Sequence, residues 1–391
     1  MNEVIVTLMW LFASAAALPL LVLAVEVWLG IWRTKPITLN GQLPNTCILI
    51  PAHDEAKIIG QTLARLGAIL GPSVRVLVVA DNCTDDTAAI AREHGFEVLE
   101  RFNLEKRGKG FALAFGRDHL RAKPPECVVV VDADCHSDPR SIADVARYSC
   151  ATQSAVQARY VFVPDHAASP KVQISNFAFW IKNVVRQRGV SRVGGGAILT
   201  GTGMAFPWSI FDRVTLATGS IVEDLALSVE LAQSGETPLF LEQAQVLSAS
   251  AGEQATIGQR SRWEHGLLSV AANHAFALLK HGFRAMDRKV FLLGLHLIVP
   301  PLALLVVLSA LIAAFLLAAA ISVDNWYPFA VLVTSLLAAL MGVLVNWALE
   351  GRRWLTPQAL AALPFYLMWK LPIYGRFFAR KRVGWVRTDR D

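Results

Sequence analysis

The sequence predicts an α/β domain with a mostly parallel sheet, set between apolar helices long enough to cross a membrane. Of its 391 residues, 54% are hydrophobic and 17% are charged, and the apolar residues concentrate toward both ends. The middle instead alternates short apolar runs, acidic loops and helical periodicity, which is the pattern of βαβ units. Within it, Val128–Val131 is a run of β-branched residues typical of a strand buried on both faces of a parallel sheet.

The apolar segment from Val4 to Trp32 has the length of a transmembrane helix. Small residues at 13–17 resemble a signal-peptide cleavage site, but the apolar run continues past them and no basic region precedes it. We therefore expect a retained transmembrane helix over residues 1–33. Because Arg33 and Lys35 follow directly, the positive-inside rule predicts that the N-terminus lies outside and the middle domain in the cytosol.

In the middle of the chain, a carboxylate follows each predicted strand. The apolar runs at 46–51 and 74–80 are strand candidates, and Glu55, Asp81 and Asp132 follow the successive strands. Neither a G-x-G-x-x-G nor a Walker A sequence is present, which argues against those two phosphate-binding folds. Carboxylates at strand ends suit hydroxyl groups, base-edge N–H groups and a metal ion better than bare phosphate.

The strand at 128–131 runs into Asp132-Ala133-Asp134. In open α/β sheets, ligands bind beyond the carboxyl ends of the strands. Two carboxylates there repel each other unless a cation lies between them, and hard oxygen ligands favour Mg²⁺ or Mn²⁺. The alternative is a simple helix cap, with Ser137–Pro139 as a turn.

Positive charge for a phosphate is offered by Arg107-Gly108-Lys109-Gly110. Glycines beside a lysine let the backbone and the ammonium group approach a phosphate together. The alternative is a surface turn before a helix at 111–120.

The net charge of +6 does not indicate nucleic-acid binding, because no aromatic-basic interleaving accompanies it. The five cysteines form no C-x-x-C pair, so we expect reduced thiols.

The C-terminal part predicts further membrane segments. Two uncharged runs, Phe291–Ser322 and Pro328–Leu349, predict a transmembrane hairpin over residues 291–350, kinked at Pro300-Pro301. Residues 264–290 mix apolar and basic positions, as an interfacial helix does, and residues 172–188 do the same, with a packed core helix as the alternative. Prolines and Lys370 interrupt 357–378, so residues 351–391 predict a re-entrant or interfacial segment and a basic cytosolic tail.

Six short motifs occur in a recognisable order. They are Pro51–Glu55, Asp81, Arg107–Gly110, Asp132–Asp134, Glu223-Asp224 and Gln259-Arg260-Ser261-Arg262-Trp263. With them the chain resembles the membrane-bound family 2 glycosyltransferases that have a GT-A domain, in the cellulose, chitin and hyaluronan synthase group. The last motif matches the Q-x-x-R-W of that group, whereas Asp54 stands where the family often has Asn. The resemblance covers the predicted cytosolic GT-A catalytic domain, residues 34–263.

The resemblance implies a site for a UDP-sugar and a divalent cation, Mg²⁺ or Mn²⁺. The nucleotide-sugar-binding residues it implies are Pro51, His53, Glu55, Asp81, Lys109, Asp132, Ala133, Gln259 and Arg262. The metal would be held by Asp132 and Asp134. The acceptor-binding residues it implies are Gly201, Thr202, Gly203, Glu223 and Trp263. Asp224 would be the catalytic base.

Two of these roles also have simpler explanations. Asp224 begins an apolar-periodic helix, where a carboxylate can act as a cap, although the adjacent Glu223 would raise a neighbouring pKa and so favour a base. Gln259, Arg262 and Trp263 share one helix face, which suits phosphate and sugar binding. Arg and Trp also favour headgroup depth in a membrane, so an interfacial pair is the alternative.

These observations predict an inverting sugar transfer in cell-surface or exopolysaccharide synthesis. The enzyme would be a multi-pass protein of the inner (plasma) membrane, with a cytosolic catalytic domain and a lipid-linked or saccharide acceptor. A processive, polymer-secreting synthase is the first alternative, favoured by the motif at 259–263. Few predicted spans favour single addition instead. A catalytically silent scaffold that binds nucleotide or saccharide is the alternative from another class.

Overall fold

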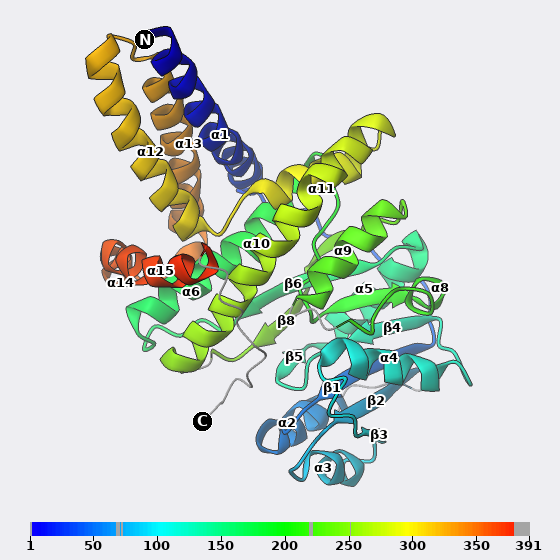
Figure 1. Ribbon diagram of the computed structural model, residues 1–391. Helices are drawn as coiled ribbons and strands as arrows, with labels where there is room; N and C mark the ends of the chain where they lie inside the picture. Colours follow the sequence, from blue (N-terminus) through cyan, green and yellow to red (C-terminus); the bar gives the residue numbers. More distant parts are fainter. Residues whose placement is uncertain (1, 68–70, 72, 219–221, 251, 379–391) are drawn as a thin grey trace. The chain divides into compact units, whose positions relative to one another are not determined.

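The computed structural model describes residues 2–67, 71, 73–218, 222–250 and 252–378, and the chain divides into two compact units (Figure 1). The sheet unit comprises Arg33–Val163 and Gly195–Ser250, and the helical unit comprises Met1–Trp32, Pro164–Gly194 and Ala251–Asp391. Residues 164–194 and 251–263, which the sequence assigned to the catalytic domain, thus pack with the apolar helices. The end of the predicted basic tail, residues 379–391, lies outside the described residues.

The sheet unit contains an eight-stranded sheet in the order β3-β2-β1-β4-β7-β6-β8-β5. Its strands are β1 Thr46–Ala52, β2 Val74–Asp81, β3 Glu97–Arg101, β4 Cys127–Val130, β5 Cys135–Ser137, β6 Val156–Phe162, β7 Met204–Pro207 and β8 Leu239–Ser248. Among the strands that the structure describes, only β5 and β7 pair antiparallel with their neighbours. The predicted Rossmann-like, mostly parallel sheet is therefore confirmed.

The central strands are apolar because helices cover both of their faces. All four residues of β4 are buried, and in β1 the five residues Thr46–Ile50 are buried in succession. Ala52 of β1 pairs with Ala80 of β2, and Leu49 of β1 pairs with Val130 of β4. This register brings the carboxyl ends of β2, β1 and β4 to one edge of the sheet.

The helices of the sheet unit connect these strands. They are α2 Ala56–Gly67, α3 Thr87–Glu93, α4 Lys109–Leu120, α5 Pro139–Thr152, α8 Trp208–Phe211 and α9 Glu223–Gln233. The start of α5 separates the two interpretations of the acidic loop after β4. Asp138 caps this helix, since its side chain accepts a hydrogen bond from Ser141 N at 2.8 Å, and Pro139 takes the first turn. The capping role therefore belongs to Asp138 and not to Asp132 or Asp134.

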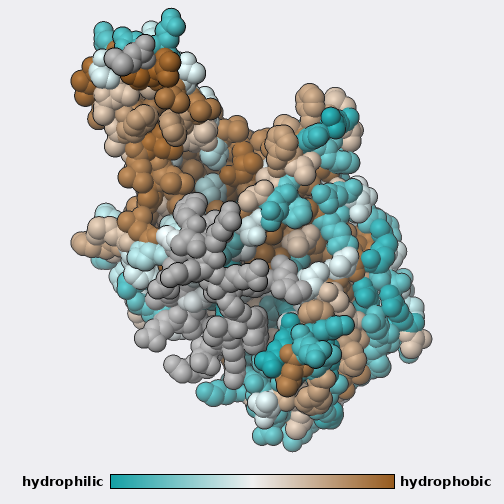
Figure 2. All heavy atoms as spheres, viewed as in Figure 1, coloured by the Kyte–Doolittle hydropathy of each residue, from teal (hydrophilic) through white to brown (hydrophobic). Residues whose placement is uncertain are grey.

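The helical unit is built from α1 Asn2–Leu29, α6 Pro170–Trp180, the π-helix η1 Ile181–Arg186, α7 Gln187–Arg192, α10 Glu253–Arg284, α11 Arg288–Ile298, α12 Leu302–Val323, α13 Tyr327–Leu349, the 3₁₀ turn η2 Gly351–Arg353, α14 Pro357–Ala361 and α15 Leu363–Phe378. Among the described residues, three helices are long and apolar enough to cross a membrane: α1, α12 and α13. Figure 2 shows the hydrophobic surface over α1 and α12.

Two C-terminal expectations differ from the observed helices. The uncharged run 291–322 is two helices, because α11 ends at Ile298 and α12 begins only at Leu302, after Pro300 and Pro301. Proline lacks an N–H group and ends a helix more readily than it kinks one. The predicted interfacial segment at 264–290 is also not separate, since α10 runs without a break from Glu253 to Arg284.

Residues 172–188 follow the packed-helix alternative and not the interfacial one. Nearly every side chain of α6, η1 and α7 in this stretch is buried, including the polar ones. Arg186 donates from Nε to Glu26 Oε2 of α1 at 2.5 Å, and Glu26 Oε1 lies 2.7 Å from His296 Nδ1 of α11. This ion pair explains why the apolar helix α1 tolerates a buried carboxylate.

Glycines allow α1 to approach η1 and α7 at backbone distance. A Cβ atom on Gly189 would lie 2.0 Å from the carbonyl oxygen of Glu26, and one on Gly30 would lie 2.2 Å from that of Val185. Neither contact can be relieved by a side-chain rotation, because each carbonyl belongs to a helix backbone.

We expect Gly189→Ala to lower the stability of the helical unit by about 1–3 kcal/mol, the usual cost of overpacking. Gly258→Ala is the matched control on α10, because a Cβ atom there meets nothing within 4 Å. Alanine is the better helix former, so the control should unfold at the same or a slightly higher temperature. Thermal unfolding in detergent measures both, and equal melting temperatures for the two variants would contradict the close approach.

Candidate functional site: a carboxylate-rich sheet edge

The first part of the site lies where β1 and β2 end. His53 Nδ1 lies 2.7 Å from the carbonyl oxygen of Asp81 and therefore donates to it, which joins the two strand ends. Asp54 has a positive φ of 52°, and its side chain accepts from Thr84 N at 2.6 Å. Glu55 directly precedes α2, and its N–H group donates to Thr87 Oγ1 at 2.8 Å. Pro51 is the penultimate residue of β1.

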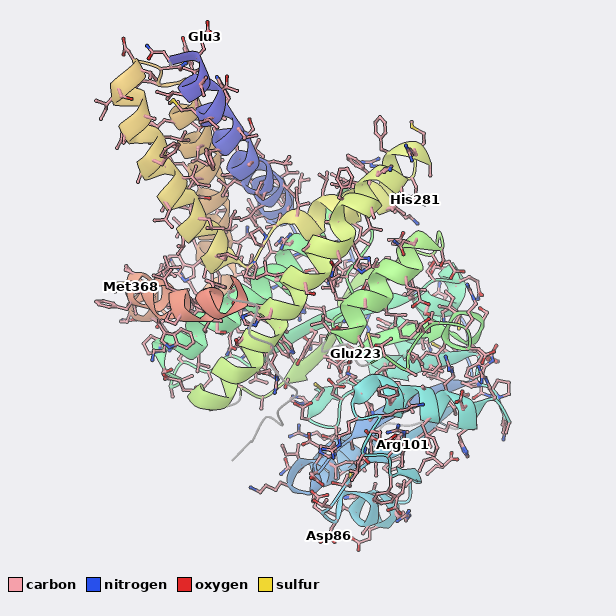
Figure 3. All side chains as sticks on the ribbon, in the orientation of Figure 1. Glu3, Asp86, Arg101, Glu223, His281 and Met368 are labelled. Atoms are coloured by element: carbon pink, nitrogen blue, oxygen red, sulfur yellow. The ribbon has the colours of Figure 1, made fainter. Side chains whose placement is uncertain are left out.

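Arg101 is a member of this edge that the sequence interpretation did not select. Its Nη1 contacts Asp81 Oδ1 at 2.5 Å, and its Nη2 donates to the carbonyl oxygen of Lys106 at 2.8 Å. Asp81 is buried, so the guanidinium group neutralises a carboxylate that would otherwise be costly there. Arg101 ends β3, the neighbour of β2 in the sheet, and this position at a strand end was the available signal (Figure 3).

The second part lies beyond β4, where Asp132 and Asp134 are both half-buried. Asp132 N donates to Thr202 Oγ1 at 3.1 Å, and Asp134 Oδ2 accepts from Ser248 Oγ at 3.4 Å. Ligand atoms of Asp132, Asp134 and Cys135 lie within 4.8 Å of one another, as a metal site requires. The intervening Ala133 is buried and accepts a hydrogen bond from Thr62 Oγ1 through its carbonyl oxygen.

Cys135 is not suited to be a ligand of a hard cation. Burial raises the pKa of its thiol to about 12, so it stays protonated. The thiol instead lies 3.4 Å from Asp134 Oδ1, to which it donates. The two aspartates are thus left as the oxygen donors of this cluster, and such donors suit Mg²⁺ or Mn²⁺.

The third part brings Lys109 and Asp224 to the same place. Lys109 is the first residue of α4, and its ammonium group pairs with Asp132 Oδ1 and donates to the carbonyl oxygen of Gly201 at 2.6 Å. Gly201 has a φ of 88°, and a Cβ atom on it would lie 3.4 Å from both Lys109 Nζ and Asp224 Oδ2. The ammonium group and the Asp224 carboxylate therefore both lie beside Gly201, near the position that a side chain there would take.

Burial opposes the charge on Lys109, but nearby carboxylates outweigh it. Its pKa is raised, because Asp132, Glu223 and Asp224 favour the protonated form more than desolvation disfavours it. Gly203, the other glycine of the loop, has a φ of 67°, and a Cβ atom there would lie 2.7 Å from Val246 Cγ2. The loop 201–203 therefore needs glycine for its backbone and for its packing.

Glu223 and Asp224 form a carboxylate pair at the start of α9 (Figure 3). Desolvation and the neighbouring Asp224 raise the pKa of Glu223 to about 8, against the opposing effect of Lys109. Glu223 therefore carries a proton at neutral pH, which lets it donate a hydrogen bond. The sequence interpretation expected the pair to favour a base, and the raised pKa falls on Glu223.

The residues of the Q-x-x-R-W motif lie in the helical unit, within α10. Trp263 stacks on Phe179 of α6, with ring centroids 5.5 Å apart. The guanidinium carbon of Arg260 lies 4.8 Å from the centre of the Trp263 ring and 4.5 Å from that of Phe179. Within this motif the structure thus joins Arg260 to Trp263, although the sequence singled out Gln259 and Arg262.

Taken together, the sheet unit has the α/β fold of GT-A domains, with carboxylates gathered at the ends of its central strands. A family model described as glycosyltransferase like family 2 matches residues 44–266, more than half of the chain. The chain belongs to this family. No curated protein matches the sequence.

Solved structures of low sequence identity are similar to this chain, and the first named here shares its fold. A mannosyltransferase from Pyrobaculum calidifontis, solved with GDP-Man and Mn²⁺, is 17% identical with a TM-score of 0.52, and the match covers 97% of this chain and 95% of that one. Glucosyl-3-phosphoglycerate synthase from Mycobacterium tuberculosis, solved with Mn²⁺ and UDP, is also 17% identical, with a TM-score of 0.42 over 59% of this chain and 85% of that one.

We expect Gly201→Ala to reduce activity by roughly ten-fold or more, because its methyl group would lie against both Lys109 and Asp224 and misplace a reactant. Gly235→Ala is the matched control, since Gly235 also has a positive φ, of 78°, but a Cβ atom there meets nothing within 4 Å. Both variants should lose similar stability. Turnover of a nucleotide sugar, normalised to melting temperature, separates them, and equal activities would contradict the placement of Gly201.

The raised pKa of Glu223 also predicts a pH-dependent stability. Between the unfolded value near 4.5 and the folded value of about 8, the folded chain keeps a proton that the unfolded chain releases. Glu223 therefore destabilises the fold progressively as pH rises through this window. With a metal chelator present, the melting temperature of Glu223→Gln should increasingly exceed that of the unsubstituted chain as the pH rises to about 8. The exposed Glu93→Gln is the control, and a gain independent of pH would refute the shift.

Proposed function

We propose that the chain transfers a sugar from a UDP-sugar, with inversion at the anomeric carbon, to a lipid-linked or saccharide acceptor. The observation that carries this proposal is the arrangement at Gly201, where Lys109 and Asp224 both lie beside one glycine and Lys109 pairs with Asp132. One site then contains a carboxylate able to accept a proton and an ammonium group able to face a diphosphate. An inverting sugar transfer needs both.

The metal of this reaction would be held by Asp132 and Asp134. Their oxygens fit Mg²⁺ or Mn²⁺, and the mannosyltransferase that shares the fold was solved with Mn²⁺. When bound, the cation would neutralise charge on the diphosphate. Ser248 donates a hydrogen bond to Asp134 and so orients it. Asp132 is oriented by its ion pair with Lys109 and by the hydrogen bond from its own N–H group to Thr202.

Asp224 would act as the base. Its carboxylate takes the proton from an acceptor hydroxyl while that oxygen forms a bond to the anomeric carbon. The bond from this carbon to the diphosphate oxygen breaks, and the nucleoside diphosphate leaves with the electron pair. Lys109 balances the charge that develops on the leaving group. Glu223, whose pKa is raised to about 8 by desolvation and by Asp224, keeps its proton at neutral pH beside this base.

The remaining roles rest on the motifs. Glu55, Asp81 and His53 would line the nucleoside, with Pro51 shaping the loop that follows β1. Gln259 and Arg262 would bind the diphosphate, and Trp263, with Gly201–Gly203 and Glu223, the acceptor. The order of these motifs supports a place near the cellulose, chitin and hyaluronan synthases. That the donor is a UDP-sugar is itself part of the proposal, because the mannosyltransferase of similar fold was solved with a GDP-sugar, GDP-Man.

We place the catalytic unit on the cytosolic face of the inner membrane, because Arg33 and Lys35 follow α1. Three candidate spans leave little wall for a polymer channel, which favours single addition in surface-polysaccharide synthesis. The Q-x-x-R-W motif favours a processive synthase instead. A short labelled product on a gel supports the first, and a ladder of long products supports the second.

We expect Asp224→Asn to lower transfer by about 10²–10⁴-fold, the usual contribution of a general base, while nucleotide-sugar affinity stays within a few-fold. Asp118→Asn, an exposed carboxylate on α4, is the control and should keep full activity. Transfer and donor hydrolysis are measured across UDP- and GDP-sugars with Mn²⁺ in lipid. Undiminished transfer by the variant would overturn the base assignment, and donor binding without turnover by the unsubstituted chain would favour the scaffold.

A further inference from the structure

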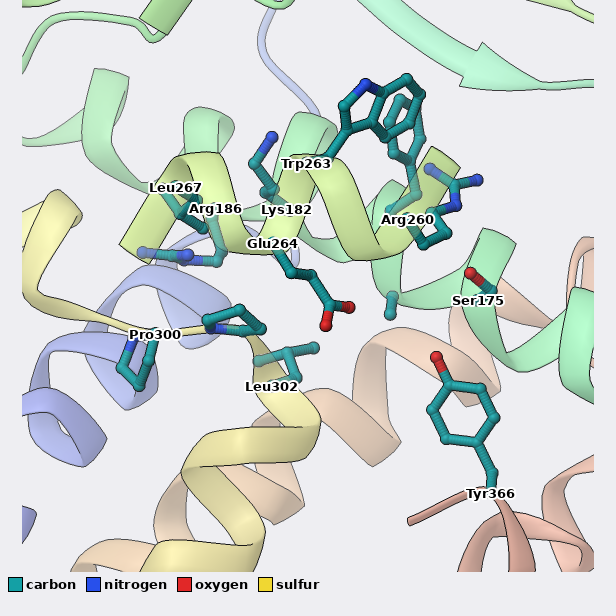
Figure 4. A pocket seen from close by; sticks show the side chains of 13 residues that line it. Ser175, Lys182, Arg186, Arg260, Trp263, Glu264, Leu267, Pro300, Leu302 and Tyr366 are labelled. Atoms are coloured by element: carbon teal, nitrogen blue, oxygen red, sulfur yellow. The ribbon is translucent and has the colours of Figure 1, made fainter. Parts of the chain in front are cut away.

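Polar side chains inside this protein fix one segment against another. In the helical unit, Glu264 and Arg186 line a hollow of about 80 Å³ (Figure 4). Glu264 pairs with Lys370 at 2.8 Å, which joins α10 to α15, and Arg186 pairs with Glu26, which joins η1 to α1. These two ion pairs thus hold helices together. In the sheet unit, neutral buried side chains instead bind the backbone of a loop beside the candidate site.

This loop, residues 199–202, precedes β7 and has no helix or strand of its own. Leu199 and Thr202 are buried within it. A buried backbone N–H or C=O group is costly unless it forms a hydrogen bond. Side chains therefore supply partners that a neighbouring strand would otherwise provide.

Gln157 binds the loop at the residues before and after Gly201. Its Oε1 accepts from Thr200 N at 2.8 Å, and its Nε2 donates to the carbonyl oxygen of Thr202 at 2.9 Å. Nε2 also donates to the carbonyl oxygen of Ala158 at 2.8 Å, so both N–H groups of the amide are used. Gln157 belongs to β6 and is fully buried, so it ties the loop to the sheet.

Ser228 ties the start of the same loop to α9. Its Oγ accepts from Leu199 N at 2.8 Å and donates to the carbonyl oxygen of Asp224 at 2.9 Å. Ser228 is fully buried, and Asp224 lies one turn earlier on the helix. One hydroxyl group thus joins the loop to the helical turn that carries Asp224.

The loop also contacts groups from two further elements. The carbonyl oxygen of Gly201 accepts from Lys109 Nζ at 2.6 Å, and Thr202 Oγ1 accepts from Asp132 N at 3.1 Å. With the link to Asp224, one loop therefore contacts the segments that carry the ammonium group, the carboxylate proposed to bind metal and the proposed base. A displacement of the loop would disturb all three.

We propose that Gln157 and Ser228 are positioning residues for the sugar transfer proposed above, on which this step rests. Both are buried and act through the loop 199–202, which keeps Lys109, Asp132 and Asp224 in their relative positions. Catalytic groups need such support from packed, hydrogen-bonded side chains. A misplacement of about 1 Å can lower a rate by about 10²-fold.

Ser228→Ala removes the hydroxyl group with little change of volume. It should lower kcat for transfer by roughly ten-fold, while the KM for the nucleotide sugar stays within about three-fold, because the ends of β1 and β2 are not disturbed. Ser234→Ala is the matched control. Ser234 follows the last residue of α9 and also donates to the carbonyl oxygen four residues earlier, that of Glu230, at 3.0 Å, but it is exposed. The control should keep full activity, and an unchanged kcat in Ser228→Ala would overturn the role of Ser228.

Gln157→Met keeps the length of the side chain and removes its three hydrogen bonds. It should lower kcat by roughly 10–100-fold. Gln173→Met is the matched control, because Gln173 is a buried glutamine of the helical unit whose Nε2 donates to the carbonyl oxygens of His166 and Ala168, at 3.1 and 2.8 Å. Both variants should lose similar melting temperature, but only Gln157→Met should lose kcat per folded molecule. Equal kcat values would overturn the role of Gln157.

Hydrogen exchange of the peptide 198–203 tests the anchoring of the loop without activity. In Gln157→Met the N–H group of Thr200 loses its acceptor and should exchange roughly ten-fold faster, whereas Gln173→Met should leave it unchanged. Unchanged exchange in Gln157→Met would overturn the anchoring. Faster exchange with an undiminished kcat rejects the positioning role alone. Faster exchange in a protein whose unsubstituted form transfers no sugar rejects the glycosyltransferase function and leaves the anchoring of the loop standing.

Discussion

The charge balance between Lys109 and Asp132 is the interaction on which the candidate site depends. The sheet brings three strand ends to one edge, and each of them delivers a carboxylate. Such an edge is unfavourable unless cations are placed among the acids. Lys109, in the first turn of α4, forms an ion pair with Asp132, and Arg101, at the end of β3, forms one with Asp81. Asp134 lies close enough to Asp132 for oxygens of both carboxylates to hold one cation.

Much of this edge could be predicted because it depends on local pattern. The buried run before Asp132 identifies a central strand, and the rule that ligands bind at strand ends then locates the site. The antiparallel strand β7 could not be predicted in the same way, because its four residues resemble any short apolar run. Yet β7 pairs with β4 and follows the loop that holds Gly201. The nearness of Gly201 to Lys109 is a property of tertiary pairing.

The interpretation of residues 172–188 as an interfacial helix failed for a physical reason. Periodicity reports which residues are apolar, but it does not say whether lipid or protein covers them. Residues 172–188 carry basic side chains among aromatic ones and therefore resembled a surface helix, while Arg186 and Arg188 are buried among protein groups. Arg101 was missed for a different reason. Its carboxylate partner, Asp81, is distant in sequence and meets it only because β2 and β3 are neighbours.

The pairing of Glu26 with Arg186 has a consequence for how the chain is made. The two residues are 160 positions apart, so a ribosome releases α1 long before η1 exists. During that interval the first helix holds a carboxyl group whose guanidinium partner has not been synthesised. Its final rotation about its own axis must therefore wait for η1 and for His296. Biogenesis of this protein thus has a late step in which an early segment is locked in place by later ones.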